Sequence, residues 1–502
     1  MFEKILIANR GEIAIRVMRA CKEMGITPVG VYSECDRCAL HVSHAYESYP
    51  IGPSPSKESY LSIERILDAA KKSGAEAIHP GYGFLAENAD FAEACESEGI
   101  VFIGPTARTI RLMGDKLQAR ASVASSGVKV IPGSEKVVNS PKEAAALAKS
   151  IGYPVIIKAA GGGGGKGMRI VSKASEFENA LSLTIGEAES AFGSDAVYIE
   201  KYIEKPKHIE IQVLADGKGN LVTLGERECS LQRRYQKIIE EAPSVAVTES
   251  KRKALSSAAK KAAKAAGYTS AGTVEFMMGQ NGEFYFLEMN TRLQVEHPVS
   301  EMVYGVDIVK EQIRIAAGEK LGIDQSKIHP IGHAIEARIY AEDPARNFVP
   351  SVGMIKRLGL PQGPGVRNEN GVYAGYEIPI YYDPLIGKVI AWAEDRPSAI
   401  RRIHRALKEY QLDGVRTNVE FLLWAIDEKS FVNGAYDTGT IERAFEPSLL
   451  HSNKEAAMLA TIAGSITAFN TLKNRDLSVE NEDTDGTWKR TARVEGLRKP
   501  RI

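Results

Sequence analysis

Short apolar runs alternate with helical patterns between residues 1 and 113 of the chain. The apolar run at 4–8 predicts a buried strand, and Ile13, Val17 and Cys21 recur at the spacing of a helix over 12–23. Further short strands are expected at 28–32, 76–79 and 101–104. Because strands that alternate with helices form parallel sheets covered by helices, we expect an N-terminal doubly wound α/β domain.

The pattern changes after residue 113, where strands and helices no longer alternate regularly. A strand-rich stretch at 196–224 and a hairpin around Asn281 and Gly282 predict a mixed central domain. The following region is again strand-rich and ends in helices. The expected fold class is therefore α/β together with α+β, over an N-terminal domain (1–113), a central domain (114–320), a C-terminal domain (330–447) and a tail (448–502).

The tail has a pattern of its own. Met458, Ile462, Ile466 and Phe469 are spaced by four, four and three positions, which predicts one amphipathic helix. Beyond it the chain is polar, first acidic and then basic. We expect a poorly ordered terminus or a docking tail there.

Composition and charge narrow the class of protein. The 502 residues suggest about three domains, and the 64 basic residues balance 64 acidic ones, which argues against a general nucleic-acid binder. No apolar run approaches the roughly 18 residues of a membrane span, and the first residues lead into a strand pattern rather than a signal peptide. We expect a cytoplasmic protein that binds neither membrane nor nucleic acid.

Five cysteines form an odd and sparse set, which is typical of a reducing compartment. Cys35 and Cys38 make a C-x-x-C pair that could serve metal or redox chemistry. Because no second pair and no nearby His-x-His would complete such a site, the sequence favours a structural role for them.

A glycine-rich loop between two expected strands is the first sign of nucleotide chemistry. Five consecutive glycines at 161–165 lie between Lys158 and Lys166, so that backbone N–H groups and positive charge could face phosphate oxygens. Gly167 stands where a Walker A loop needs Ser or Thr, and the strand expected at 168–171 excludes a dinucleotide fingerprint, which must open a helix. We predict that the loop closes over a nucleotide; the alternative is a surface loop without a ligand.

The predicted hairpin brings two glutamates together. If the Asn-Gly dipeptide at 281–282 forms the turn, Glu275 and Glu288 stand directly opposite each other. Like charges opposed across a ladder destabilise it, so a compensating Mg²⁺ or Mn²⁺ ion is expected. Met277 and Phe286 would share this face, which disfavours the alternative of two fully solvated glutamates.

Polar residues continue at alternate positions beyond this hairpin. In an extended chain they would all point the same way, and five polar groups in a row beside a metal pair indicate the wall of an active site. These residues are Glu288, Asn290, Arg292, Gln294 and Glu296.

At this point the sequence resembles the biotin carboxylases, members of the ATP-grasp superfamily, over residues 1 to 447. The motifs that carry the resemblance are I-A-N-R-G-E-I-A (7–14), H-P-G-Y-G-F-L-A-E-N (79–88), M-G-D-K (113–116), the glycine loop, H-I-E-I-Q-V (208–213), E-R-E-C-S-L-Q-R-R (226–234), E-M-N-T-R-L-Q-V-E-H-P (288–298), G-H-A-I-E-A-R-I (332–339) and Y-Y-D-P-L-I-G-K (381–388). The resemblance implies an ATP-grasp central domain with a mobile lid over about 131–203, and a C-terminal biotin carboxylase domain. The sequence departs from the common pattern at Tyr235 and Val352.

The resemblance also implies a role for each matching residue. ATP would be bound by Lys116, Lys158, Gly163, Gly164, Gly165, Glu200, Lys201, Ile203, His208 and Gln232. Two Mg²⁺ or Mn²⁺ ions would be held by Glu275, Glu288 and Asn290, and bicarbonate by Lys237, Arg292, Gln294 and Val295. Glu296 would deprotonate bicarbonate, and Arg338 would stabilise the biotin enolate.

The implied reaction is the carboxylation of biotin through carboxyphosphate, within an acetyl-CoA, other acyl-CoA or pyruvate carboxylase. Because no Met-Lys-Met biotinylation site occurs and a carboxyltransferase-sized domain would not fit, we expect a separate biotin carboxyl carrier protein and a separate carboxyltransferase. The resemblance also implies that the chain itself forms a homodimer. W-K-R-T-A-R at 488–493 is weakly similar to the segment after this domain in some acyl-CoA and two-subunit pyruvate carboxylases.

Two rival functions remain open at this point. One is an amide- or peptide-forming ligase of the same superfamily, which would share the glycine loop and the carboxylates. The joint presence of Arg292, Gln294, Glu296 and Arg338 argues against it. The other is a non-catalytic nucleotide-binding subunit. The intact Glu296, Lys237 and both metal glutamates argue against it.

Overall fold

The computed structural model describes residues 1–134, 136–138, 140–159, 167–193, 195–450 and 454–476. The chain divides into two units, residues 1–446 and 447–502. Within the described ranges, no helix is long and apolar enough to cross a membrane.

The N-terminal part is a five-stranded parallel sheet with the order β3-β2-β1-β4-β5, which confirms the predicted class. Its strands are β1 (Lys4–Ile7), β2 (Thr27–Tyr32), β3 (Glu47–Pro50), β4 (Ala77–His79) and β5 (Val101–Phe102), with helices α1 (Gly11–Glu23), α2 (Leu40–His44), α3 (Ile63–Ser73), α4 (Ala89–Ser97) and α5 (Ala107–Gly114) between and after them. The pattern did not predict β3, because this edge strand is half-exposed and carries no apolar run.

An eight-stranded antiparallel sheet is the largest sheet of the 1–446 unit, with the order β13-β12-β9-β10-β11-β14-β21-β19. Its strands are β9 (Lys207–Ala215), β10 (Leu221–Arg233), β11 (Gln236–Ala242), β12 (Ser270–Met278), β13 (Phe284–Asn290), β14 (His333–Tyr340), β19 (Val366–Asn370) and β21 (Leu385–Ala393). The sheet continues from β11 into β14, across the predicted boundary between the central and C-terminal domains. The domain boundaries themselves therefore stay a prediction.

Helices bury the apolar surface of this sheet on several sides. Residues of α6 (Lys116–Ser125) and α9 (Glu249–Ala265) share a core with β9, β12 and β13. Residues of α1 and α11 (Ile308–Ala316) share another core with β9 and β10, which joins the N-terminal part to the large sheet. α10 (His297–Tyr304) packs on β11, β14 and β21, and α12 (Arg396–Glu409) contacts β14 and β21.

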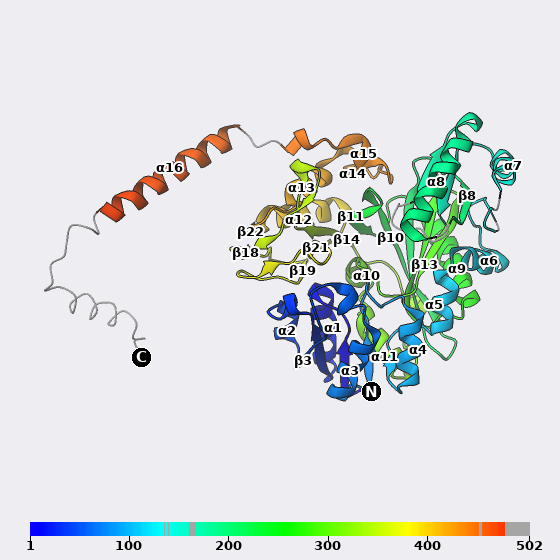
Figure 1. Ribbon diagram of the computed structural model, residues 1–502, viewed down its shortest axis with the longest axis horizontal. Coiled ribbons are helices and arrows are strands. Elements are labelled where there is room, and N and C mark those ends of the chain that lie inside the picture. Colours follow the sequence, from blue (N-terminus) through cyan, green and yellow to red (C-terminus); the bar gives the residue numbers. More distant parts are fainter. Residues whose placement is uncertain (135, 139, 160–166, 194, 451–453, 477–502) are drawn as a thin grey trace. The chain divides into compact units, whose positions relative to one another are not determined.

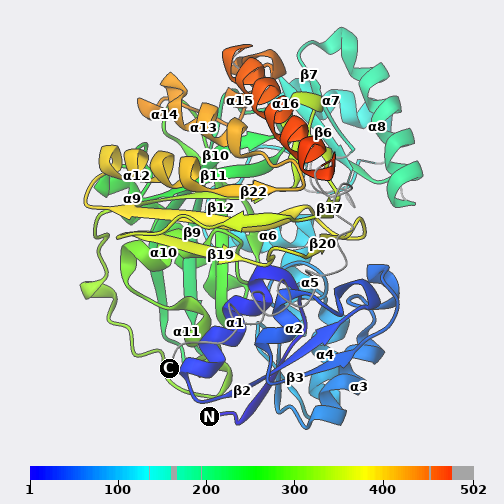
Figure 2. The same cartoon turned by 90° about the vertical axis from the view of Figure 1, so that its left-hand side faces the viewer.

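A small antiparallel sheet, β7-β6-β8, carries the two ends of the glycine loop. Its strands are β6 (Val155–Ala159), β7 (Met168–Val171) and β8 (Val197–Lys201), and α7 (Pro141–Ile151) and α8 (Phe177–Phe192) pack on it. In Figures 1 and 2 this part and the N-terminal parallel sheet lie toward opposite ends of the 1–446 unit. The loop glycines Gly163, Gly164 and Gly165 lie outside the described residues.

The C-terminal part adds short strands and helices beside β19 and β21. Three two-stranded sheets pair β15 (Glu342–Asp343) with β16 (Val349–Pro350), β17 (Gly353–Met354) with β20 (Glu377–Ile378), and β18 (Arg357–Gly359) with β22 (Gln411–Asp413). The helices α13 (Val419–Asp427), α14 (Lys429–Val432) and α15 (Thr440–Ala444) end this unit.

The second unit contains α16 (Lys454–Asp476), which confirms the helix predicted in the tail. The side chains of Met458, Ile462, Ile466 and Phe469 are exposed on it. The charged stretches after Asp476 lie outside the described residues.

Candidate active site

Buried charges from the strands β9, β11 and β12 gather around one lysine. The ammonium group of Lys237 on β11 lies 2.6 Å from Glu210 Oε2, 3.0 Å from Glu275 Oε1 and 2.5 Å from Glu296 Oε1. Glu210 and Glu296 are fully buried and Glu275 nearly so. Buried carboxylates are stable only with such compensation, so Lys237 is the cation around which this site is built.

The hairpin places Glu275 directly opposite Glu288, which confirms the predicted pairing. The turn differs from the prediction, because Gly279 donates a backbone hydrogen bond to Glu283 at 2.8 Å and leaves a three-residue loop, 280–282, instead of two residues. A loop of this length shifts the register by one residue.

A β-bulge restores the register before the glutamates are reached. With the three-residue loop alone, Glu275 would face Leu287, but the ladder shifts by one residue between Glu275 and Phe276, so that Leu287 is the extra residue. Phe286 consequently pairs with Phe276 and is buried with it in the core. The prediction that Phe286 shares the face of the glutamates was therefore wrong.

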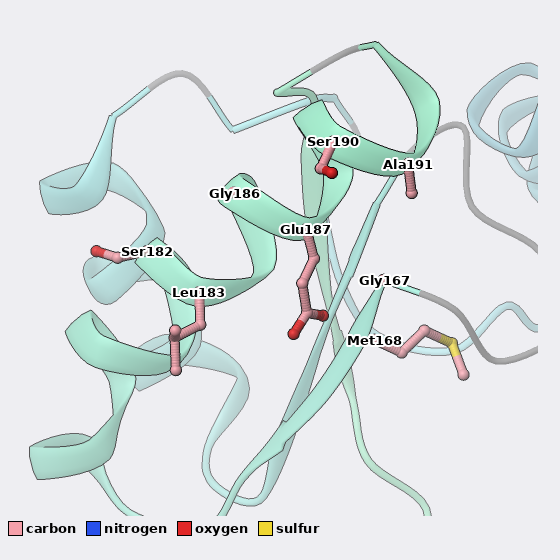
Figure 3. A pocket seen from close by; sticks show the side chains of 8 residues that line it. All are labelled: Gly167, Met168, Ser182, Leu183, Gly186, Glu187, Ser190 and Ala191. Carbon is pink, nitrogen blue, oxygen red and sulfur yellow. The ribbon is translucent and has the colours of Figure 1, made fainter.

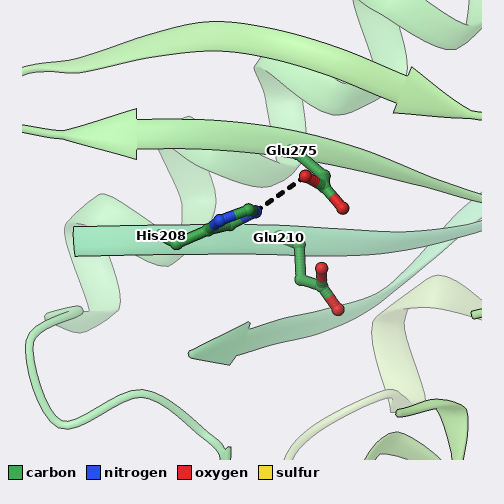
Figure 4. Close-up of side chains that lie close together, drawn as sticks. All are labelled: His208, Glu210 and Glu275. Carbon is green, nitrogen blue, oxygen red and sulfur yellow. Dashed lines mark hydrogen bonds and ion pairs between the residues drawn. The ribbon is translucent and has the colours of Figure 1, made fainter. Parts of the chain in front are cut away.

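Glu275 is enclosed by donors on both carboxylate oxygens. Oε2 lies 2.7 Å from His208 Nε2, and Oε1 accepts hydrogen bonds from Asn290 at 2.8 Å, from Gln294 at 3.1 Å and from Lys237 at 3.0 Å. Figure 4 shows His208 reaching toward Glu275 from the neighbouring strand. Burial opposes ionisation, but Lys237 and His208 outweigh it, and the pKa of Glu275 lies well below its usual range.

Glu288 has the opposite electrostatic situation. It lies at the solvent-exposed rim of the site, but the protein around its carboxylate still displaces part of that group's hydration. Loss of solvation, and next the negative charge of Glu275, raise the pKa of Glu288. A bound divalent cation would relieve this repulsion, and the oxygen donors of Glu275, Glu288 and Asn290 suit Mg²⁺ or Mn²⁺. These residues therefore fit the expected metal.

A second group of ligand atoms is less suited to a metal. One ligand atom each from His208, Glu210 and Glu275 lies within 4.8 Å of the others, as Figure 4 illustrates. Lys237 already pairs with both glutamates of this group. Since an ammonium ion holds that position, the rim at Glu288 is the better place for a divalent cation.

The polar residues after the hairpin come together, but not through the extended backbone that was predicted. β13 ends at Asn290, and the chain up to α10 is irregular rather than extended. Arg292 nevertheless reaches its neighbours, with Nη2 3.1 Å from Asn290 Oδ1 and Nη1 3.1 Å from Gln294 Oε1. Its Nε donates to Glu87 Oε2 at 2.7 Å. The prediction of an extended wall was wrong beyond Asn290, although its residues do come together.

Glu296 lies between two cations. Its Oε1 contacts Lys237 at 2.5 Å and its Oε2 accepts a hydrogen bond from Arg338 Nη2 at 2.8 Å. Burial opposes ionisation, but Lys237, Arg338 and Arg227 outweigh it and hold the pKa of Glu296 well below its usual range. Glu296 is thus a carboxylate at neutral pH, which is the form that can accept a proton.

The predicted nucleotide-binding side chains form a second cluster beside the small sheet. Lys158 Nζ lies 2.6 Å from Glu200 Oε2, and Arg120 Nη1 lies 2.8 Å from Glu200 Oε1. Lys201 donates instead to the backbone carbonyls of residues 152 and 153. Burial lowers the pKa of Lys116, against the attraction of Glu288.

The remaining predicted residues are Gln232, Val295 and Ile203. Gln232 Nε2 donates to His208 Nδ1 at 2.9 Å, which leaves the His208 Nε2 proton for Glu275. The carbonyl of Val295 accepts a hydrogen bond from Lys388 at 2.7 Å. Ile203 is half-buried just before β9.

Three residues of the site were not singled out from the sequence. Glu210 pairs with Lys237, Glu87 holds Arg292, and Arg120 holds Glu200. Glu210 and Glu87 do lie inside motifs of the resemblance, H-I-E-I-Q-V and H-P-G-Y-G-F-L-A-E-N. Arg120 has no such signal, because its contact depends on how α6 packs.

A separate pocket lies on the small sheet. Figure 3 shows its lining by α8 and the start of β7, including Gly167, Met168, Leu183 and Glu187. Glu187 pairs with Arg169, so its charge is already compensated. Since none of the predicted catalytic residues lines this pocket, we assign no chemistry to it.

The chain matches three family models. They are described as Biotin carboxylase, N-terminal domain, over residues 1–110; Carbamoyl-phosphate synthase L chain, ATP binding domain, over residues 115–324; and Biotin carboxylase C-terminal domain, over residues 336–443. Together they span most of the chain up to the end of the first compact unit.

Individual relatives agree with the models. The chain is 52% identical to "Biotin carboxylase 1" of Bacillus subtilis, over 88% of this chain and 98% of that protein. It is 51% identical to the "2-oxoglutarate carboxylase small subunit" of Hydrogenobacter thermophilus, over 88% of this chain and 93% of that protein. Among solved structures, the biotin carboxylase domain dimer of Hydrogenobacter thermophilus 2-oxoglutarate carboxylase, in complex with MgADP, ADP and bicarbonate, is similar with a TM-score of 0.86, at 50% identity, over 90% of this chain and 99% of that chain.

Proposed function

Since the chain belongs to the biotin carboxylase family, it is an ATP-dependent enzyme that carboxylates biotin, and we propose that its substrate is the biotin of a separate carrier protein. ATP, Mg²⁺ and bicarbonate are the small molecules it uses, in line with the ligands of its structural relatives.

In the first step, Glu296 accepts the proton of bicarbonate, and a bicarbonate oxygen attacks the γ-phosphorus of ATP. ADP leaves and carboxyphosphate forms. Arg292 offers a planar fork that suits a carboxylate-like anion, and Gln294 adds a polar contact beside it. A divalent cation at Glu275 and Glu288 would neutralise charge on the transferring phosphoryl group.

We propose two roles for Lys237 in this step. It balances the buried charges of Glu210, Glu275 and Glu296 in the resting enzyme. An ammonium ion with three donors can also turn toward a bound anion, so Lys237 is suited to hold bicarbonate next to the base.

In the second step, carboxyphosphate breaks into CO₂ and phosphate, and the phosphate takes the ureido proton of biotin. Negative charge then develops on the ureido oxygen, and the deprotonated nitrogen attacks CO₂. The guanidinium of Arg338 stabilises that oxygen, and because it cannot lose its own proton it stays charged throughout.

The relatives of the chain support a proposal about its partners. One of them is the small subunit of 2-oxoglutarate carboxylase, and another is the biotin carboxylase subunit of pyruvate carboxylase, so both are parts of larger enzymes. One structural relative is a dimer. We propose that this chain acts as a homodimer beside a carrier and a carboxyltransferase subunit.

The observation that carries the proposal is the contact of Glu296 with both Lys237 and Arg338. This contact places the proposed base for bicarbonate next to the group proposed to bind the biotin anion. The two steps of the reaction need such closeness, because the carboxyphosphate formed in the first must release its CO₂ next to biotin in the second. A test is ATP hydrolysis measured with and without bicarbonate, and with and without free biotin. We expect hydrolysis to depend on bicarbonate and to rise with biotin, with carboxybiotin as product.

Each rival predicts another result in this assay. An amide-forming ligase would need an amine acceptor and would ignore biotin. A nucleotide-binding subunit would bind ATP without hydrolysing it under any of the four conditions. Either result would reject the proposed function.

A further inference from the structure

Arg338 contacts a second buried carboxylate that the proposed mechanism does not use. Its Nε donates to Glu240 Oε1 at 2.6 Å, and its Nη2 lies 2.5 Å from the same oxygen. Nη2 also donates to Glu296 Oε2 at 2.8 Å. Glu240 is fully buried on β11, and Arg338 is nearly buried on β14. Arg338 is therefore held between two carboxylates, one of which is the proposed base.

The side chain of Glu240 makes no other hydrogen bond within the described part of the chain. Its Oε2 is buried and makes no hydrogen bond to any described residue. A carboxylate buried at such cost serves structure or function through its single partner. That partner is the group proposed to bind the biotin anion.

The geometry also explains why Arg338 does not engage Glu296 more closely. Arginine and carboxylate prefer a two-point contact through Nε and Nη or through both Nη atoms. Because Glu240 takes the Nε edge, Arg338 gives Glu296 only one N–H group. A two-point pair with Glu296 would draw the guanidinium away from the position at which it meets the biotin anion.

We propose that Glu240 is a positioning residue: it holds the guanidinium of Arg338 at the biotin site and keeps it from closing a two-point pair with Glu296. This inference rests on the proposed function of Arg338 and deepens it. Glu240 itself touches no reacting atom.

The surroundings of Glu240 give this role a pH dependence. The charged and titratable groups that face it are Cys229 of β10, Lys237 of its own strand, Glu336, Arg338 and Tyr340 of β14, and Glu296 before α10. Burial raises the pKa of Glu240 to about 7, although Arg338 opposes the shift. Below that pH Glu240 is a neutral acceptor, and above it a charged one that holds Arg338 more firmly.

The test compares Glu240→Ala and Glu240→Gln with wild type in two assays. One is bicarbonate-dependent ATP hydrolysis without biotin, and the other is carboxylation of free biotin. Losing a hydrogen bond to a charged group corresponds to about a 10- to 100-fold change. We expect Glu240→Ala to lower kcat/KM for biotin by about that factor. The factor by which it lowers bicarbonate-dependent ATP hydrolysis should be at least about tenfold smaller. Glu240→Gln, which keeps an acceptor oxygen, should recover much of the loss.

The pH profile separates positioning from a general effect on folding. The ratio of Glu240→Gln to wild type in kcat/KM for biotin should lie near one below pH 6 and fall as the pH rises past 7. Glu241→Gln is the matched control: Glu241 is the next residue of β11, is fully buried and pairs with Arg396, but lies outside the site. Its two activities should fall together if they fall at all.

Failure of the inference differs from failure of the proposed function. If wild type does not carboxylate biotin, the function itself is wrong. If wild type is active and Glu240→Ala lowers both activities by the same factor, or neither, Glu240 is not a positioning residue. A pH-independent ratio for Glu240→Gln would likewise overturn the role of its charge.

Discussion

Glu87 accepts a hydrogen bond from Nε of Arg292 at 2.7 Å, although 205 positions of the chain separate the two residues. The other oxygen of Glu87 accepts from the backbone N–H of Thr291 at 3.0 Å. Glu87 thereby fixes both the backbone and the side chain at this point. The N-terminal part of the chain thus orients a side chain proposed to bind bicarbonate.

Glu87→Ala is expected to weaken bicarbonate binding more than it slows turnover. Arg292 would keep its charge but lose its fixed orientation, and an oriented charge-assisted hydrogen bond corresponds to about 10-fold or more in binding. Steady-state kinetics should show a KM for bicarbonate raised about tenfold, with kcat changed less. Asp90→Ala is the control, since Asp90 forms a comparable but exposed pair with Arg111. An unchanged KM in Glu87→Ala would contradict this role.

Glu296→Gln is expected to abolish bicarbonate-stimulated turnover and to leave ATP binding near normal. The amide cannot accept the bicarbonate proton, and loss of a general base costs about 10²–10⁴ in rate. Rapid-quench or coupled ATPase measurements give the rate, and a fluorescent ATP analogue gives the affinity. Glu226→Gln, which removes another fully buried, Arg-paired carboxylate, controls for lost stability. A kcat close to that of wild type would reject Glu296 as the base.

The sequence was sufficient to predict the features that depend on local periodicity. The parallel strands β1, β2, β4 and β5 and the tail helix α16 were all predicted from apolar spacing. The pairing of Glu275 with Glu288 was also predicted, but from a two-residue turn. The structure reaches it with a longer loop and a bulge, whose effects on register cancel.

Long-range packing could not be predicted in the same way. The eight-stranded sheet joins β11 to β14, and the contact of Glu240 with Arg338 spans 98 positions. Nothing in either segment specifies its partner, because strand pairing depends on the whole fold. The polar run from Asn290 to Glu296 shows the same limit: its residues converge, but through an irregular chain that periodicity does not describe.

Glu275 and Glu288 should act as one unit in metal binding. Replacing either with Gln is expected to raise the Mg²⁺ concentration needed for half-maximal ATP turnover. Because both would hold the same cation cluster, the double variant should lose much less than the product of the two single losses. The measurement is a Mg²⁺ titration of ATPase activity for the four proteins of the cycle. Multiplicative losses would show that one of the two is not a ligand.

Glu336→Gln should change how stability depends on pH. Glu336 is fully buried, and neither carboxyl oxygen makes a hydrogen bond to the described residues. Burial raises the pKa of Glu336 well above its usual range, against the opposing charge of Lys388. In the unfolded chain the same group ionises near the ordinary glutamate pKa of 4.5. Between these two pKa values the folded state holds one proton more than the unfolded state, so this group makes the folded state lose stability as pH rises, by up to about 1.4 kcal/mol per pH unit.

The glutamine variant has no such proton, so its thermal midpoint relative to wild type should rise steadily from pH 5.5 to pH 8. Glu301→Gln provides the contrast. Arg16 and Arg367 outweigh burial and lower the pKa of Glu301, so its carboxylate is ionised in both states above pH 5.5. The midpoint difference of that variant from wild type should therefore be nearly constant over the same range. A constant difference for Glu336→Gln as well would mean that Glu336 is ionised in the folded protein, and Lys388 would then be its counter-ion.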